Sequence, residues 1–400
     1  LFLSVSSLRS YTWLIPVRWM KSGQVQTPVW WLMEKEVVDV KMRSSSSWIL
    51  ANLNVTGYYR VNYDLGNWER LLAQLDLDHE VLPLLNRAQL VDDAFNLARA
   101  KVISSTLALR TTCYLSMETE YMPWQSALNN LQYFFLMLDR TEVHPLMQDY
   151  ILKLITPLFL HFKNITSDWT AVPERLTDQY NQENAIRMAC QTGLAECQDL
   201  TRTWFRQWMD DPQHNRIQQN LRSAVYCGAM ATGDAAVWDF GWSQLQEATV
   251  ASEARTLMWA LACSARNRLV CRYLSYTLNS TLIRKQDASF VITAVASNRV
   301  GHDLAWDFVR EHWEYMFTEY GVGSFSFSSI ISGVTAHLST PAELQQLEEF
   351  VEEHGGAAGL GSATLAVQQA LERTRINIQW LQDNQQELYN WFNSHLDRSS

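Results

Sequence analysis

The stretch NLNVTGYYRVNYD, residues Asn52–Asp64, decides how the rest of the chain is divided. It alternates like a strand and is rich in aromatic and β-branched residues, which are the residues that strands favour. Nearly everything after it has the spacing of helices. A helical chain of 400 residues that opens with strands and has no starting methionine is expected to begin within a larger molecule.

Residues 11–64 are predicted to form a small β-sandwich that is incomplete at its start. The strand-like segments are separated by turn-forming residues, and they read LIPVRWM, PVWWLM, WILANLNV and GYYRVNY. Residues 1–10, LFLSVSSLRS, are too short and irregular for a signal peptide, and we treat them as a segment of uncertain origin.

Residues 65–400 are predicted to be helical throughout. In LLNRAQLVDDAFNLARA the apolar residues Leu84, Ala88, Val91, Phe95 and Ala98 recur at steps of four and three, which places them on one helix face.

Helix boundaries in this part carry signals of their own. Thr340-Pro341-Ala342-Glu343 is an N-terminal capping signal, and that helix is expected to end at His354-Gly355-Gly356. A long final helix is predicted at about residues 362–392. A dozen or more helices without intervening strands favour a HEAT- or armadillo-like α-solenoid over a compact all-α domain. The fold class is therefore mainly α.

Composition limits the partners of the chain. Its net charge of −10 argues against binding to nucleic acid, which requires a basic surface. The most apolar segment, Leu131 to Leu138, is followed directly by Asp139 and Arg140, so the sequence predicts no membrane span in this chain.

Six cysteines and three N-x-[ST] sequons suggest an extracellular protein without proving it. A bridge between Cys190 and Cys197 would fix a tight helix–helix corner, and Cys227 and Cys263 could join neighbouring helices. The alternative is six buried thiols in a cytosolic protein. The sequons begin at Asn54, Asn164 and Asn279.

The residues of this chain offer no recognisable catalytic machinery. A helical zinc peptidase needs two His four residues apart with Glu beside the first, so that both imidazoles bind one metal and the carboxylate accepts a proton from bound water. Here Pro83 stands four residues after His79 of the single His-Glu pair, and none of the nine His has another His at that distance. Nucleophile elbows, phosphate-binding loops and CxxC pairs are also missing from the sequence.

The sequence nevertheless resembles the C-terminal half of the M1-family zinc aminopeptidases, from about Trp13 to His395. The stretches that carry the resemblance are NLNVTGYYRVNYD, LNRAQLVDDAFNLA, EYMPWQSALNNL, NLRSAVYCGAMATG, RYLSYTLN, LIRKQDAS, LAWDFV, GSFSFSSII, ELQQLEEF and GSATLAVQQALERTRINIQWL. In that family the strands would be the third of four domains and the helices the fourth.

The resemblance implies a non-catalytic part of a larger enzyme. Family members hold zinc with HExxH and a further Glu, and bind the substrate's amino end with GAMEN, in upstream domains; neither motif occurs in this chain. Cofactors are therefore expected to be none in this chain and zinc in the full-length enzyme. The helical part would close over the active site and shape a cavity for peptide substrates.

The resemblance also implies several sites. Phe325 and Ser329 correspond to a segment near the substrate channel, although Ser329 stands where close relatives carry Asn. The alternative for Phe325 is an ordinary place in the core. Disulfides are implied for Cys190–Cys197 and Cys227–Cys263. Buried thiols are expected for the two remaining cysteines, with exposure as the alternative for Cys271.

Partners and location follow from the same resemblance. Glycosylation is expected at Asn54, Asn164 and Asn279. Expected partners are the missing N-terminal catalytic domains, peptide substrates and a second copy through the helical domain. The expected location is the extracellular face of the plasma membrane, with the anchor upstream. The alternative to a peptidase portion is a stand-alone secreted helical-repeat binding module without catalysis.

Overall fold

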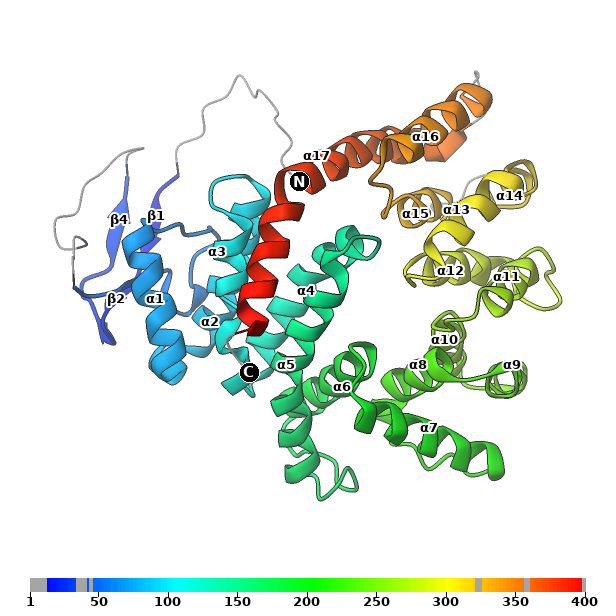
Figure 1. Cartoon of the computed structure of the whole chain (residues 1–400), viewed down its shortest axis with the longest axis horizontal. Helices are drawn as coiled ribbons and strands as arrows, with labels where there is room; N and C mark the ends of the chain where they lie inside the picture. The colour runs from blue at the N-terminus through cyan, green and yellow to red at the C-terminus, as the bar shows by residue number, and fades with distance from the viewer. Residues whose placement is uncertain (1–12, 34–41, 43–45, 321–325, 356–359, 398–400) are drawn as a thin grey trace. The chain divides into compact units, whose positions relative to one another are not determined.

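The computed structural model describes residues 13–33, 42, 46–320, 326–355 and 360–397. Within them the chain is mainly α, with seventeen α-helices and five short strands near the start, which confirms the predicted fold class (Figure 1). The segment 1–10 of the sequence analysis lies outside the described residues.

The strands form two small antiparallel sheets. β1 pairs with β4, with Ile15 opposite Leu32, and β2 lies between β3 and β5. Val17, Trp19 and Ile49 form the buried centre of the apolar cluster that these strands share. The strands are β1 (Ile15–Val17), β2 (Trp19–Lys21), β3 (Gln24–Val25), β4 (Trp30–Leu32) and β5 (Ile49–Ala51).

The stretch that opened the sequence analysis is not the strand that its alternation predicted. After β5 the backbone turns through left-handed conformations at Asn52 and Asn54 (both φ 55°) and forms a short 3₁₀ helix, η2 (Leu53–Val55). Residues 56–64 contain no strand. The prediction of a strand over GYYRVNY is therefore wrong.

Side chains take the backbone hydrogen bonds that a strand partner would have supplied. The Asn52 side chain accepts from the Gly57 amide (2.8 Å) and donates to the Gly57 carbonyl (2.9 Å). The Val61 amide donates to the Asp93 carboxylate at 2.9 Å. These side chains thus satisfy backbone groups of Gly57 and Val61 without a neighbouring strand.

The described residues fall into two compact units. The first comprises the residues up to Gln132 together with Lys153–Asn181, and the second comprises Tyr133–Leu152 and Gln182–Ser400. The predicted domain limits, 11–64 and 65–400, stay a prediction.

The first unit contains the sheets and the early helices. Its elements after β5 are η2, α1 (Leu65–Asp78), η3 (His79–Val81), α2 (Leu84–Arg99), α3 (Ser105–Arg110), η4 (Cys113–Met117), and parts of α4 (Tyr121–Leu138), α5 (Val143–Ile165) and α6 (Leu176–Gln191).

Helix α2 is the helix predicted from apolar spacing. Ala88, Val91, Phe95 and Ala98 are all buried, as their spacing requires. Arg87, which the pattern placed away from the apolar face, is also buried, because it forms an ion pair with Glu118.

The second unit continues as a succession of helices, from green to red in Figure 1. Its elements are the ends of α4 and α6, the start of α5, α7 (Ala195–Asp210), η5 (Gln219–Leu221), α8 (Arg222–Thr232), α9 (Ala235–Glu247), α10 (Ala251–Leu261), α11 (Asn267–Tyr276), α12 (Lys285–Ala296), α13 (His302–Glu311), α14 (Trp313–Tyr320), α15 (Ser326–Val334), α16 (Pro341–His354), η6 (Gly361–Ala363) and α17 (Thr364–Asp397).

Helices close in sequence pack on one another in this unit. Helix α8 contacts α7 and α10, α12 contacts α13 and α15, and α15 contacts α17. The Trp238 indole on α9 donates to the Leu261 carbonyl at the end of α10 (3.1 Å). The assignment to the HEAT or armadillo type stays a prediction.

Two predicted helix limits are confirmed. Helix α16 begins with a capping box in which Thr340 and Glu343 bond each other's backbone amides, and it ends at His354. Helix α17 begins at Thr364, close to the predicted start, and runs a few residues past the predicted end.

Candidate functional site

The His-Glu pair of the sequence lies at a break between helices. His79 and Glu80 belong to the 3₁₀ helix η3, and Pro83 is the N-cap of the following α2. A zinc-peptidase pair needs two imidazoles one turn apart on a continuous helix, so this segment does not have the required geometry.

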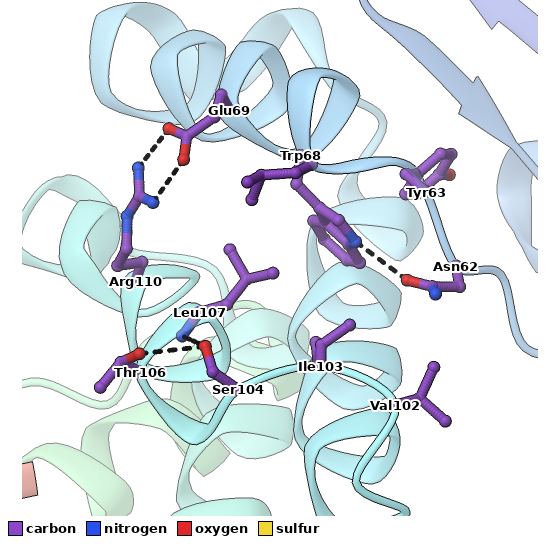
Figure 2. A pocket seen from close by; sticks show the side chains of 11 residues that line it. Asn62, Tyr63, Trp68, Glu69, Val102, Ile103, Ser104, Thr106, Leu107 and Arg110 are labelled. Atoms are coloured by element: carbon purple, nitrogen blue, oxygen red, sulfur yellow. Dashed lines mark hydrogen bonds and ion pairs between the residues drawn. The ribbon is translucent and has the colours of Figure 1, made fainter. Parts of the chain in front are cut away.

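A cavity of about 480 Å³ lies in the first unit, between the start of α1 and the α2–α3 connection (Figure 2). Its apolar lining includes Leu65, Val102 and Ile103. At its edge the Arg110 guanidinium makes two hydrogen bonds to the Glu69 carboxylate (2.7 and 2.5 Å), and these hold the pKa of Glu69 below its usual value.

The polar groups of this cavity already have structural tasks. The Trp68 indole N–H donates to Asn62 Oδ1 at 3.0 Å, and the Ser104 hydroxyl caps α3 by accepting from the Leu107 amide at 3.0 Å. The cavity suits an apolar part of a ligand that lies beside the Arg110–Glu69 ion pair, in which the two charges cancel. Its lining residues supply no activated nucleophile.

The predicted substrate-side residues belong to the segment around α15. Phe325 lies outside the described residues, and Ser329 is exposed on α15. The helix is fixed by its neighbour Phe327, which is fully buried with its ring 4.6 Å from that of Trp313. Ser329 is therefore accessible on a well-anchored helix.

Arg373 of α17, which the sequence analysis did not single out, lies against the same helix. Its guanidinium donates to the Ser332 carbonyl (3.1 Å) and to Thr335 Oγ1 (2.8 Å). Burial lowers the pKa of Arg373. The sequence around Arg373 does not indicate this contact, because the contact depends on how α15 and α17 pack.

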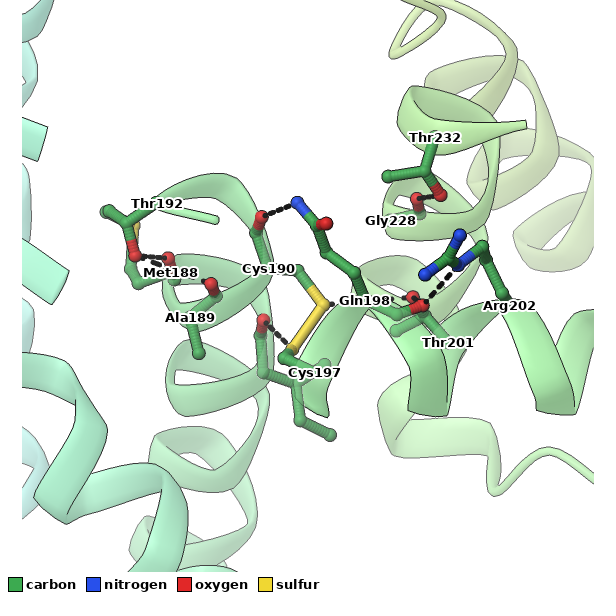
Figure 3. The surroundings of a disulfide bond; sticks show 11 residues. Met188, Ala189, Cys190, Thr192, Cys197, Gln198, Thr201, Arg202, Gly228 and Thr232 are labelled. Atoms are coloured by element: carbon green, nitrogen blue, oxygen red, sulfur yellow. Dashed lines mark hydrogen bonds between the residues drawn. A yellow bond between two sulfur atoms is a disulfide. The ribbon is translucent and has the colours of Figure 1, made fainter. Parts of the chain in front are cut away.

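The first disulfide that the resemblance implied is present at the α6–α7 corner. Cys190 and Cys197 are bonded, with Cα atoms 5.1 Å apart, and Gly193 between them adopts φ 94°, which favours glycine (Figure 3). Helices α7 and α8 also approach closely beside this bond, since a Cβ on Gly228 would lie 3.1 Å from Thr201 Oγ1.

The second implied disulfide joins Cys227 of α8 to Cys263, which lies two residues after the end of α10. Cys227 and Cys263 are bonded, with Cα atoms 5.3 Å apart. Cys113 and Cys271 belong to neither disulfide; Cys113 is half-buried and Cys271 is exposed. The expectation of buried thiols is thus wrong for Cys271, for which exposure was the stated alternative.

All three sequon asparagines are exposed. They are Asn54 in η2, Asn164 near the end of α5 and Asn279 after α11. The side-chain carbonyl of Asn279 accepts from the amide (3.0 Å) and the hydroxyl (2.8 Å) of Thr281, the third sequon residue. Access does not limit modification at any of them.

Among the described residues, one group of three has donor atoms close enough for a metal ion. Its members, Asp303, His337 and Glu343, have donor atoms that all lie within 4.8 Å of one another. The Arg140 guanidinium contacts both carboxylates of this group, at 2.5 Å from Glu343 and 3.4 Å from Asp303. A cation is therefore already in place, and the group does not fit a catalytic zinc.

Comparison with known proteins identifies the family. Residues 48–376 match the family model of the ERAP1-like C-terminal domain. The chain belongs to this family.

Several aminopeptidases are similar in sequence to this chain, which carries the ERAP1-like C-terminal domain. Aminopeptidase Ey of Gallus gallus is 51% identical over 392 residues, and aminopeptidase N is 49% identical in Bos taurus and 48% in Homo sapiens. Each alignment covers 96% of this chain but 40% of the relative. The predicted resemblance to the C-terminal part of aminopeptidases of the M1 family is confirmed, and the chain spans about two fifths of these relatives' length.

Proposed function

We propose that this chain is the C-terminal, non-catalytic portion of a membrane zinc aminopeptidase that removes N-terminal residues from peptides. Its alignment with aminopeptidases carries the proposal: almost the whole chain is covered, at about half identity, while well over half of each relative has no counterpart in it. The zinc would be held by the part of the enzyme that corresponds to the remainder of those relatives.

In this proposal residues 11–64 form the β-sandwich domain and residues 65–400 a HEAT-like helical bowl that closes over the active site. Phe325 and the exposed Ser329 face the substrate cavity. The exposure of Ser329 on an anchored helix supports this role.

The proposal extends to the surroundings of the enzyme. Carbohydrate is attached at Asn54, Asn164 and Asn279, and two copies associate through the helical domain. The enzyme is located at the outer face of the plasma membrane. No helix within the described residues is long and apolar enough to span a bilayer, and we place the anchor in the upstream part.

A first experiment tests where the chemistry resides. The 400-residue chain is expressed as a secreted protein and assayed with an aminoacyl-p-nitroanilide in the presence of zinc. We expect no turnover, because the chain supplies no zinc-activated water. Turnover that a chelator abolishes would place a catalytic site within this chain and overturn the proposal.

A second experiment tests the cavity. The chain replaces the matching C-terminal region of Gallus gallus aminopeptidase Ey, and we expect the chimaera to be active. Phe325→Ala and Ser329→Ala should raise KM for tripeptides by about 2–10-fold with a smaller change for the p-nitroanilide. Ser275→Ala, an exposed change on α11, is the matched control.

The outcomes of this second experiment are distinct. An inactive but folded chimaera would contradict the assignment as a peptidase portion and favour a stand-alone binding module. Equal KM values for the variants and the control would reject only the cavity role of the two residues.

A further inference from the structure

A cluster of ionisable side chains ties together three distant segments of the second unit. The cluster draws on the α4–α5 turn, the start of α13 and the α15–α16 connection. Arg140 reaches 163 residues along the chain to Asp303 and 203 residues to Glu343. The ionisable groups that face one another here are Asp139, Arg140, His144, Arg299, His302, Asp303, His337 and Glu343.

Two histidines form the centre of the cluster. His302 and His337 stack with ring centroids 5.0 Å apart and an interplanar angle of 15°. His302 Nδ1 lies 3.0 Å from Asp139 Oδ2, and both side chains are 5% exposed. His337 Nε2 lies 3.3 Å from Asp303 Oδ1, and its side chain is 1% exposed.

These contacts are close but poorly directed. Within the described residues, neither ring nitrogen of His337, nor His302 Nδ1, nor either Asp139 oxygen makes a well-aligned hydrogen bond. Both ring nitrogens of the nearby His144 are likewise buried without such a bond. Buried polar groups are usually satisfied, so this concentration of imidazoles points to a role beyond packing.

A metal ion is the first role to consider, and the geometry argues against it. Glu343 is already engaged, since its Oε2 accepts from the Ser339 amide (2.8 Å) and the Thr340 amide (2.9 Å). The Arg140 guanidinium contacts Glu343 Oε1 and also donates to the His337 carbonyl (3.1 Å). A metal would have to displace the Arg140 guanidinium, which donates to Asp303, Glu343, the His337 carbonyl and the Ser339 hydroxyl.

Protonation is the change that this cluster can undergo. A proton on His337, whose own side chain is 1% exposed, adds a positive charge beside Arg140 and against the face of His302. Burial first, and then His302 and Arg140, lower the pKa of His337 to about 4. Burial and Arg299 lower the pKa of His144 as well.

The direction of the effect follows from linkage. The pKa of His337 in the folded state lies below its ordinary value of 6.5, so His337 binds a proton more readily when it is exposed. The closed cluster is therefore fully stable above about pH 6.5 and loses stability as the pH falls towards 4.

We propose that His337, buried and stacked on His302, is an acid-sensitive latch, whose protonation releases the α4–α5 turn from α13 and α16. The permanent charges of Arg140, Asp303 and Glu343 hold the elements together at neutral pH. The His337 imidazole adds a positive charge to the same contact on acidification. The inference is independent of the proposed peptidase role, since it concerns helices within one unit.

The experiment compares hydrogen exchange of the full 400-residue chain at about pH 7.5 and about pH 5, corrected for intrinsic exchange rates. Peptides covering residues 133–152 and 302–310 should show an opening equilibrium that rises by roughly 30-fold on acidification, from the His337 shift alone. His337→Gln should reduce this rise to less than about 3-fold. His214→Gln is the matched control, because His214 also lies near a carboxylate but is exposed.

Three outcomes would overturn the latch. One is an equal rise in the wild type and the His337→Gln variant, and another is its loss in the His214→Gln control. The third is zinc protection of these peptides at neutral pH in the wild type but not in the variant, which would show a metal site. If His337→Gln does not fold, proton NMR of the wild-type imidazoles decides, since His337 must stay neutral to below about pH 5.

Discussion

Two charge clusters with buried members, one in each unit, are built in opposite ways. In the first unit Arg87 donates to both oxygens of Glu118 (2.7 and 3.3 Å) and to the Leu82 carbonyl (3.0 Å). Glu118 Oε1 also accepts from the amides of Thr119 and Glu120. In the second unit His302 and His337 lie near carboxylates without well-aligned bonds.

The difference shows what each cluster can do. Arg87 and Glu118 are paired with each other and hydrogen-bonded to the backbone on both sides, so the pair specifies one structure. His337 can gain a charge on acidification, because burial and its neighbours lower its pKa to about 4 without removing the group's ability to bind a proton. Satisfaction of hydrogen bonds thus separates a structural ion pair from a responsive one.

The largest test of this comparison breaks the satisfied pair. Glu118→Gln leaves the buried guanidinium of Arg87 uncompensated, and we expect a loss of about 3–5 kcal/mol in the free energy of unfolding. Urea denaturation followed by circular dichroism measures it. A loss below about 1 kcal/mol would show that the pair is not the permanent structural element described above.

The next test concerns Asp93, which is hydrogen-bonded like Glu118 but has a shifted pKa like His337. Asp93 accepts from the Val61 amide and from Arg60, yet burial raises its pKa from 3.8 to about 6. Because the pKa of Asp93 is higher in the folded than in the unfolded protein, its protonated form stabilises the fold below pH 3.8. This contribution, up to about 3 kcal/mol in the free energy of unfolding, is lost as the pH rises through 6.

Asp93→Asn should remove this pH dependence, whatever its effect on the absolute stability. The measurement is the difference in unfolding free energy between about pH 4 and about pH 7 for the variant and the wild type. The neighbouring Asp92→Asn is the control. An unchanged difference in the Asp93 variant would contradict the assignment of the shift to burial.

A smaller effect is expected at the helix start that borders the histidine cluster. Thr340→Ala removes half of the capping box of α16 while Glu343 keeps its contact with Arg140, so the loss should be about 1 kcal/mol. Thr340→Ser should restore most of it. A much larger loss, measured by urea denaturation, would mean that the cap and the cluster form one cooperative element.

The smallest effect is expected where a charge pair is exposed. Arg175 and Glu120 make a two-point contact (3.1 and 2.6 Å), but the Arg175 side chain is 56% exposed. Glu120→Gln should cost less than about 0.5 kcal/mol, and added salt should reduce this cost further because it screens an exposed pair. A cost near that of Glu118→Gln would remove burial as the explanation of the contrast.

Local signals allowed much of the helical part to be predicted from sequence. The spacing from Leu84 to Ala98 and the Thr340–Glu343 cap each depend on residues a few positions apart, and both were confirmed. The disulfide pairings required the family resemblance, because six cysteines alone permit many connections.

Features that depend on distant residues were not predictable in this way. GYYRVNY has the alternation of a strand, but the Asp93 carboxylate of α2 and the left-handed Asn52 hold it in another path. The approach of residues 139, 302 and 337 carries no signal in local spacing. Ser329 could be proposed only by resemblance, and nothing in its own neighbourhood marks it.

The length of α17 has a practical consequence for anyone who divides this chain by family limits. The family match ends at residue 376, near the middle of a helix that runs from Thr364 to Asp397. A recombinant piece cut there would lose Asn377, which accepts from the Tyr133 hydroxyl, and Trp391 and Phe392, whose rings pack on Tyr150. The exposed apolar faces left on α4 and α5 would favour aggregation, so a soluble product should retain the helix to its last turn.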